Sequence, residues 1–67
     1  NPKTVRFEDL DGLLIDFGFK RRQPRSGSSH YIYVRDGLRL TIPMNRPYLR
    51  EVYIKNVLKM LDEIENE

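Results

Sequence analysis

The sequence predicts a single α+β domain in which a helix, three strands and a second helix follow one another. Apolar residues recur at helical spacing near both ends of the chain, whereas the middle is rich in β-branched and aromatic residues. Within that middle, Asp36-Gly37 is typical of a tight turn between antiparallel strands. The simplest arrangement is a three-stranded antiparallel sheet with two helices packed on one face. A chain of 67 residues makes one domain, 1–67, with a small core.

The first helix is expected from Phe7 to Phe17. Apolar residues recur there at helical spacing: Leu10, Leu13, Leu14 and Phe17. Acidic residues crowd the first turn, where carboxylates are favoured by the positive end of the helix dipole. Gly18 is the expected C-terminal cap. Gly12 lies inside the helix and costs about 1 kcal/mol relative to alanine unless a neighbour packs closely against it.

Three strands are expected in the middle of the chain. Residues 19–23 alternate weakly between apolar and polar and end at Pro24, which predicts a short first strand. Residues 29–35 and 38–42 predict the other two, and positive φ at both residues of the intervening Asp36-Gly37 turn makes them an antiparallel hairpin.

The expected inner face of this hairpin follows from its apolar residues. Three of them share one face of the third strand: Leu38, Leu40 and Ile42. We therefore expect Ile32 and Val34 to face inward on the second strand, and Tyr31 and Tyr33 to face outward.

The second helix is expected to start near Tyr48, with Pro47 in its first turn, where a missing N–H costs nothing. Its apolar residues form one stripe: Leu49, Val52, Tyr53, Ile54, Val57, Leu58, Met60, Leu61 and Ile64. The opposite arc mixes both charge signs, which favours packing on a sheet over binding to a membrane.

Composition excludes several functional classes. The chain has no cysteine, so it offers neither a disulfide, a thiolate metal site nor a cysteine nucleophile. A single histidine gives no ligand cluster, so we expect no metal and no cofactor. There is no apolar run of about 18 residues for a membrane span, and residues 1–4 lack the apolar segment of a secretory signal. We expect a soluble, cytoplasmic protein.

Positive charge is concentrated in the middle of the chain. The net charge is only +2, yet residues 20–50 carry eight Lys or Arg and a single acid, Asp36. Such segregation is expected if one surface meets an anionic polymer such as RNA, and arginine, which dominates here, suits phosphate. An ordinary solvated basic surface is the alternative interpretation.

His30 is the candidate catalytic residue, because imidazole suits proton transfer near neutral pH. It could deprotonate a ribose 2′-OH while nearby arginines stabilise the charge that builds on the phosphorus. The candidate RNA-binding residues are Lys20, Arg21, Arg22, Arg25, Ser29, Tyr31 and Arg39. Tyr31 and Tyr33 could stack bases or simply fill a partly exposed sheet. Lys20, Tyr31 or water remain open as the group that protonates the leaving oxygen.

Several short motifs, taken in order, resemble the HicA (YcfA-like) toxin family. They are Leu13-Leu14, Asp16-Phe17-Gly18-Phe19, Gly27-Ser28-Ser29-His30-Tyr31-Ile32-Tyr33, Asp36-Gly37, Thr41-Ile42-Pro43 and Ile54-Lys55-Asn56-Val57-Leu58-Lys59. The resemblance implies a fold like a double-stranded-RNA-binding domain, mRNA interferase activity without the ribosome, and neutralisation by a HicB-like antitoxin that covers the active site. It also assigns the family's histidine to His30. The family's common Gly-Ser-His-His is Gly-Ser-Ser-His here.

Three functions follow as hypotheses. The first is a metal-independent endoribonuclease toxin that cleaves mRNA with His30. The second is a non-catalytic RNA-binding module in which arginines hold phosphate and His30 is only a contact. The third is an interaction domain whose basic face binds an acidic protein such as an antitoxin.

Overall fold

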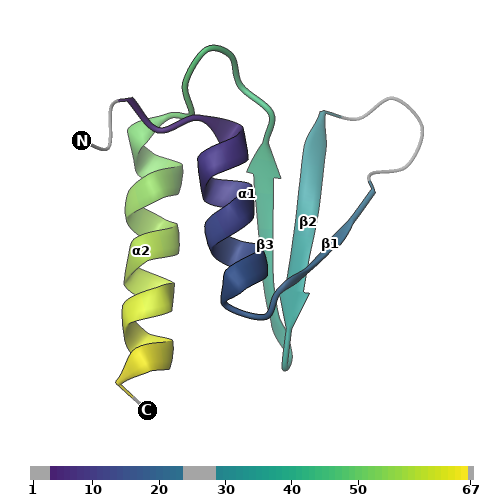
Figure 1. Ribbon diagram of the computed structural model, residues 1–67, viewed down its shortest axis with the longest axis vertical. Helices are drawn as coiled ribbons and strands as arrows, with labels where there is room; N and C mark the ends of the chain where they lie inside the picture. The colour runs from purple at the N-terminus through teal and green to yellow at the C-terminus, as the bar shows by residue number, and fades with distance from the viewer. Residues whose placement is uncertain (1–3, 24–28, 67) are drawn as a thin grey trace.

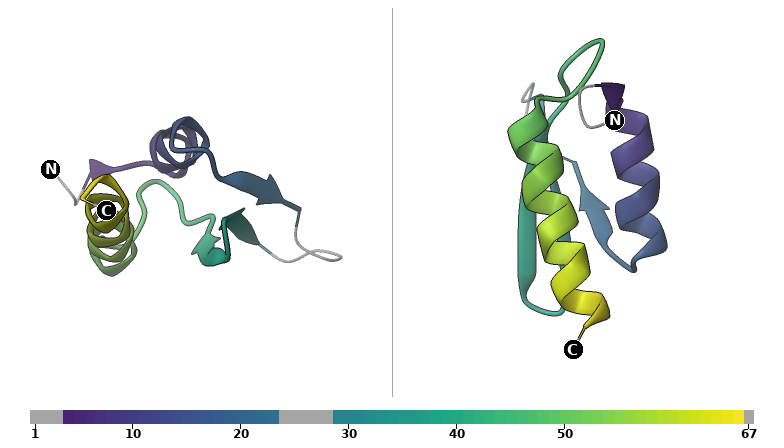
Figure 2. Two further views of the ribbon diagram at one scale, coloured as in Figure 1. Left: turned by 90° about the horizontal axis from the view of Figure 1, so that it is seen from below. Right: turned by 90° about the vertical axis from the view of Figure 1, so that its left-hand side faces the viewer.

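The computed structural model describes residues 4–23 and 29–66, and these confirm the expected α-β-β-β-α order (Figure 1). The elements are α1 (Phe7–Asp16), β1 (Lys20–Arg22), β2 (His30–Arg35), β3 (Leu38–Pro43) and α2 (Glu51–Glu65). The strands form one antiparallel sheet in the order β1-β2-β3. Both helices lie side by side on one face of this sheet (Figure 2, left).

Helix α1 ends as its sequence predicts, with Gly18 in the left-handed region at φ +90°. The N–H of Gly18 donates to the carbonyl of Ile15 at 2.9 Å, and the N–H of Phe19 donates to the carbonyl of Leu14 at 3.0 Å. This pair of bonds is the Schellman pattern, which is usually accompanied by an apolar contact across the cap. Leu14 and Phe19 are both buried, so the cap fixes the entry of β1 onto the core.

Replacing either of the two glycines of this region with alanine should change the stability of the fold, in opposite directions. Gly18→Ala forces a side chain into the left-handed region and should destabilise the fold by about 1–2 kcal/mol. Gly12 lies inside α1 with nothing within 4 Å of an added Cβ, so Gly12→Ala should stabilise by about 0.5–1 kcal/mol. Urea unfolding of the two variants checks both signs; equal effects would contradict the assigned conformations.

The β2–β3 hairpin confirms the expected turn. Asp36 has φ 46° and Gly37 has φ 83°, both in the left-handed region that a two-residue turn of this kind requires. This turn sets a register in which Tyr33 is opposite Leu40 and His30 is opposite Pro43.

The expected inner face of β2 was wrong. Tyr33 has no exposed surface and Tyr31 is half-buried against the core, so the tyrosines face the helices. Alternation then places Ile32 and Val34 on the opposite side of the sheet. Either alternating half of β2, the two tyrosines or Ile32 and Val34, is apolar enough to be buried. The tyrosine rings are larger, and they are the side chains that pack in the core. The inner face of β3 was predicted correctly, since Ile42 is buried in the core and Leu38 and Leu40 pack against it.

The start of α2 was also placed too early. The helix begins at Glu51, and Pro47 lies before it rather than in its first turn. The N–H of Leu49 donates to the carbonyl of Val5 at 2.9 Å, and the Leu49 side chain is 3% exposed. This tertiary hydrogen bond holds the segment before α2 against the N-terminal segment of the chain, and Arg50, with ψ 142°, is extended where an earlier helix would have to pass.

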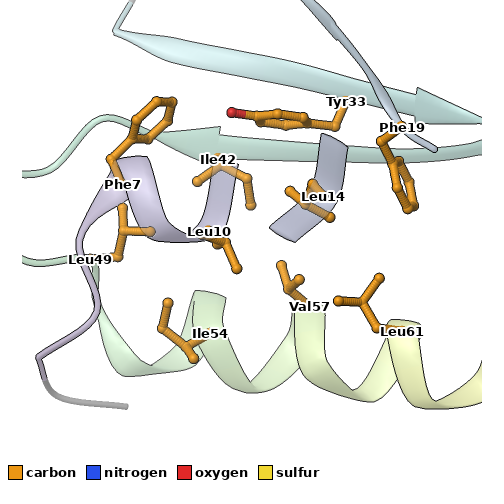
Figure 3. Packing of buried hydrophobic residues seen from close by; sticks show 10 residues of the cluster. All are labelled: Phe7, Leu10, Leu14, Phe19, Tyr33, Ile42, Leu49, Ile54, Val57 and Leu61. Carbon is orange, nitrogen blue, oxygen red and sulfur yellow. The ribbon is translucent and has the colours of Figure 1, made fainter. Parts of the chain in front are cut away.

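One apolar core joins the sheet to both helices. Ten buried residues converge between the sheet, α1 and α2: Phe7, Leu10, Leu14, Phe19, Tyr33, Ile42, Leu49, Ile54, Val57 and Leu61 (Figure 3). Within the expected stripe of α2, Ile54, Val57 and Leu61 are buried, whereas Val52 and Leu58 are exposed. The helices therefore cover one face of the sheet and leave the other to carry a site.

Candidate nucleic-acid interface

The sheet face that points away from the helices carries His30 together with three cations. Residues opposite one another in antiparallel strands share a face, so the strand register and the burial of Tyr33 define this surface. We call it the open face, and its residues are Lys20, Arg22, His30, Ile32, Val34, Arg39, Thr41 and Pro43. Ile32 and Val34 are half-buried, Pro43 is buried, and the others are exposed. The open face is thus an apolar strip along β2 with cations on both sides.

The cations of the open face are not neutralised by nearby carboxylates. Among residues 4–23 and 29–66, Lys20, Arg22 and Arg39 form no ion pair. By contrast, Arg21 and Arg46 pair with Asp11 and Glu8, on the helix side of the molecule. The concentrated charge of the middle of the chain is therefore divided by the fold. Among the described residues, Lys20, Arg22 and Arg39 lie beside β2 without an ion pair, and Arg50, also without one, lies just before α2.

His30 is the first residue of β2 and is exposed at one end of the open face. The backbone beside it is held in place, because the N–H of Met44 donates to the carbonyl of Ser29 at 2.8 Å. The side chain of Ser29 lies before the strand and is exposed. A side chain here can meet a large ligand lying on the sheet while its backbone remains fixed.

Two of the predicted RNA-binding residues lie on the other side of the sheet. Arg21 pairs with Asp11 of α1 at 3.0 Å, and its guanidinium carbon lies 5.6 Å from the centre of the Tyr31 ring. Tyr31 in turn packs edge-on against Phe7, with ring centres 5.1 Å apart. Arg21 and Tyr31 therefore join β1 and β2 to α1 and are not brought together with His30. Arg25 lies outside the described residues.

The same junction holds a hydrogen bond that sequence reasoning missed. The Tyr33 hydroxyl donates to Oδ1 of Asp11 at 2.6 Å, on the oxygen that also accepts from Arg21. Burial, together with this bond, raises the pKa of Tyr33 above its ordinary value, so the hydroxyl stays protonated and remains a donor. A signal was present in the sequence, since Asp11 is one turn after Phe7 on the side of α1 that enters the core. A carboxylate at such a position requires a polar partner.

The open face can bind a polyanion but offers little base recognition. Neither of the β2 tyrosines lies on it, so bases have no aromatic platform among its residues. Its cations can hold phosphates, its apolar strip can contact sugars and base edges, and His30 can exchange a proton. Such a surface favours binding through the backbone with weak sequence preference.

Within residues 4–23 and 29–66, no group of three or more His, Asp or Glu side chains is arranged to hold a metal ion. Neither α1 nor α2 has the length and apolar character needed to cross a membrane.

Known proteins give no further assignment of this surface. Comparison of the chain with family models, with curated proteins and with solved structures finds no match.

Proposed function

We propose that this chain is a HicA-like endoribonuclease that binds mRNA on the open face and cleaves it with His30. The proposal depends on one observation: His30 shares an exposed face with Lys20, Arg22 and Arg39, and none of these cations is neutralised by a described carboxylate. The resemblance in the motifs around His30 supports the same function. It also implies a cytoplasmic toxin held inactive by a HicB-like antitoxin that covers this face.

The proposed chemistry needs one base, one acid and positive charge. The imidazole of His30 accepts the proton of a ribose 2′-OH, whose oxygen attacks the adjacent phosphorus. The bond from phosphorus to the 5′-oxygen breaks, and that oxygen takes a proton from the imidazolium or from water. The products are a 2′,3′-cyclic phosphate and a free 5′-OH, with no change of oxidation state. Arg22 is the cation of β1 nearest the His30 end by register, so it is suited to stabilise the charge on the phosphorane.

The direct test is cleavage of a mixed-sequence single-stranded RNA by the purified protein in the presence of EDTA. We expect cleavage at many sites, with 2′,3′-cyclic phosphate ends. Products that carry a 5′-phosphate would contradict attack by the 2′-OH. Binding without cleavage by folded protein would replace the proposal with a non-catalytic RNA-binding module.

Salt dependence of RNA affinity tests the binding surface separately. If Lys20, Arg22 and Arg39 each displace one condensed counterion from a single strand, log K should fall with log salt with a slope of about −2. Each single change to glutamine should reduce that slope by about 0.7. Lys59→Gln is the matched control, because it removes one exposed positive charge from α2 and should leave the slope unchanged. Equal effects of Arg39→Gln and Lys59→Gln would show that only total charge matters.

A further inference from the structure

We propose that a groove at the hairpin end of the sheet is a second phosphate site, which holds the RNA backbone several nucleotides away from the bond that is cleaved. This inference rests on the proposed function and specifies how the substrate lies. It assigns the position of a bound phosphate to residues at the end of the sheet opposite His30.

The groove lies around the β2–β3 turn and has a volume of about 500 Å³. We call it the hairpin groove, and its lining residues are Gly18, Lys20, Val34, Arg35, Asp36, Gly37, Leu38 and Arg39. Lys20 and Arg39 are both opposite Val34 in the register, one on each neighbouring strand. Their backbones are therefore roughly 10 Å apart, two strand spacings, which leaves room for a phosphate between the two long side chains.

The charge of the hairpin groove favours an anion. It is lined by three cations and one carboxylate. Asp36 is the carboxylate, and it lies 3.7 Å from Nε of Arg35 with most of its side chain in solvent. Lys20 and Arg39 pair with no described carboxylate, so they keep their full charge for a ligand.

Another hollow in the molecule is less suited to phosphate. It has a similar volume, about 480 Å³, and is lined by Arg6, Arg46 and Pro47. Arg46 there is already bound to Glu8 at 2.6 Å, so an anion would have to displace a carboxylate. The hairpin groove has no such competitor for Lys20 or Arg39.

The position of the hairpin groove relative to His30 sets the length of RNA that reaches both. His30 and Val34 are four residues apart on β2, which is about 13 Å along the strand. A stacked single strand advances about 3.4 Å per nucleotide, so about four nucleotides, or fewer in an extended strand, separate the two sites. Arg22 lies between them by register, beside Ile32. The backbone would follow β2 from His30 past Arg22 to the hairpin groove.

Inorganic phosphate provides a test of the groove that does not depend on cleavage. In a titration followed by amide NMR, we expect saturable shifts centred on Gly18, Gly37 and Arg39. The double variant Lys20→Gln/Arg39→Gln should lose them, and Lys55→Gln/Lys59→Gln should keep them, since both pairs remove two exposed positive charges. Shifts that are absent in the folded wild type, or that persist in the Lys20→Gln/Arg39→Gln variant, would overturn the site.

Cleavage of a length series tests the role of the groove in substrate binding. RNAs are extended one nucleotide at a time on either side of a fixed cleavage position. We expect kcat/KM to rise at least tenfold on one side as the added phosphates reach the groove. In Lys20→Gln/Arg39→Gln, the ratio of kcat/KM between the longest and the shortest RNA should fall to about one. Cleavage with no length gain would overturn the groove and leave the proposed function intact. If no RNA is cleaved, the proposed function fails, and the phosphate titration still shows whether the hairpin groove binds phosphate.

Discussion

Replacing His30 with alanine is expected to lower the rate of RNA cleavage by about 10²–10⁴-fold, the usual contribution of a general acid–base group. Only His30 on the open face carries an imidazole, the side chain whose ordinary titration lies nearest neutral pH. If RNA affinity comes mainly from Lys20, Arg22 and Arg39, as we propose, the variant should retain binding. The measurement is single-turnover cleavage at saturating protein, which separates the chemical step from affinity.

Two controls separate a chemical role of His30 from a structural one. Thr41→Ala truncates another exposed side chain of the open face and should leave the cleavage rate within about twofold of wild type, since Thr41 has no acid–base group near neutral pH. Added imidazole should partly restore cleavage by His30→Ala, because it supplies the missing base in solution. A folded His30→Ala variant that cleaves at the wild-type rate would move the catalytic role to another residue.

The order of elements was predictable because each signal is local. Helical spacing defined α1, and the requirement for two positive φ values at Asp36-Gly37 defined the hairpin. The start of α2 was not predictable in this way. Pro47 suits the first turn of a helix, yet Arg50 is extended at ψ 142°, and the N–H of Leu49 donates to the carbonyl of Val5, more than forty residues earlier in the chain. Local propensity contains no information about such a contact.

The candidate site was only partly predictable for a related reason. The sequence predicts a basic segment, but it gives no reason to distinguish Arg21 from Lys20 and Arg22. Strand alternation separates them, since Arg21 faces the helices and is neutralised by Asp11. To predict this separation, one must know which side chains of β2 face the helices, and the apolar pattern of β2 leaves that ambiguous. The burial of the Tyr33 ring and its hydrogen bond to Asp11 resolve it, and both depend on contacts with another element, α1.

The largest loss of stability is expected for Tyr33→Ala. Tyr33 has none of its surface exposed, and it lies where β2 meets α1 in the core (Figure 3). Removing a buried aromatic ring costs about 3–5 kcal/mol through lost burial and the cavity left behind. A domain of this size has a stability of only a few kcal/mol. The variant should therefore be largely unfolded at 25 °C, as measured by circular dichroism and urea unfolding.

Tyr33→Phe isolates the hydroxyl from the ring. The ring stays buried, while the 2.6 Å hydrogen bond to Asp11 is lost, and a bond to a charged acceptor is worth about 1.5–3 kcal/mol. Asp11 keeps its contact with Arg21, which limits the loss to the lower part of that range. Asp11→Asn should destabilise as well, because the amide is a weaker acceptor for the hydroxyl and a weaker partner for Arg21.

The pH dependence of stability then distinguishes this hydroxyl from a ring that is merely buried. Burial and Asp11 raise the pKa of Tyr33 in the folded protein, whereas in the unfolded chain it titrates near its ordinary value of about 10. Above about pH 10 the unfolded chain therefore releases a proton that the folded protein retains, and stability falls as pH rises. Below that pH the contribution is fully present. The difference in unfolding free energy between wild type and Tyr33→Phe should be constant from pH 6 to 9 and shrink above about pH 10. A constant difference up to pH 11 would show that the hydroxyl is not held protonated by the core.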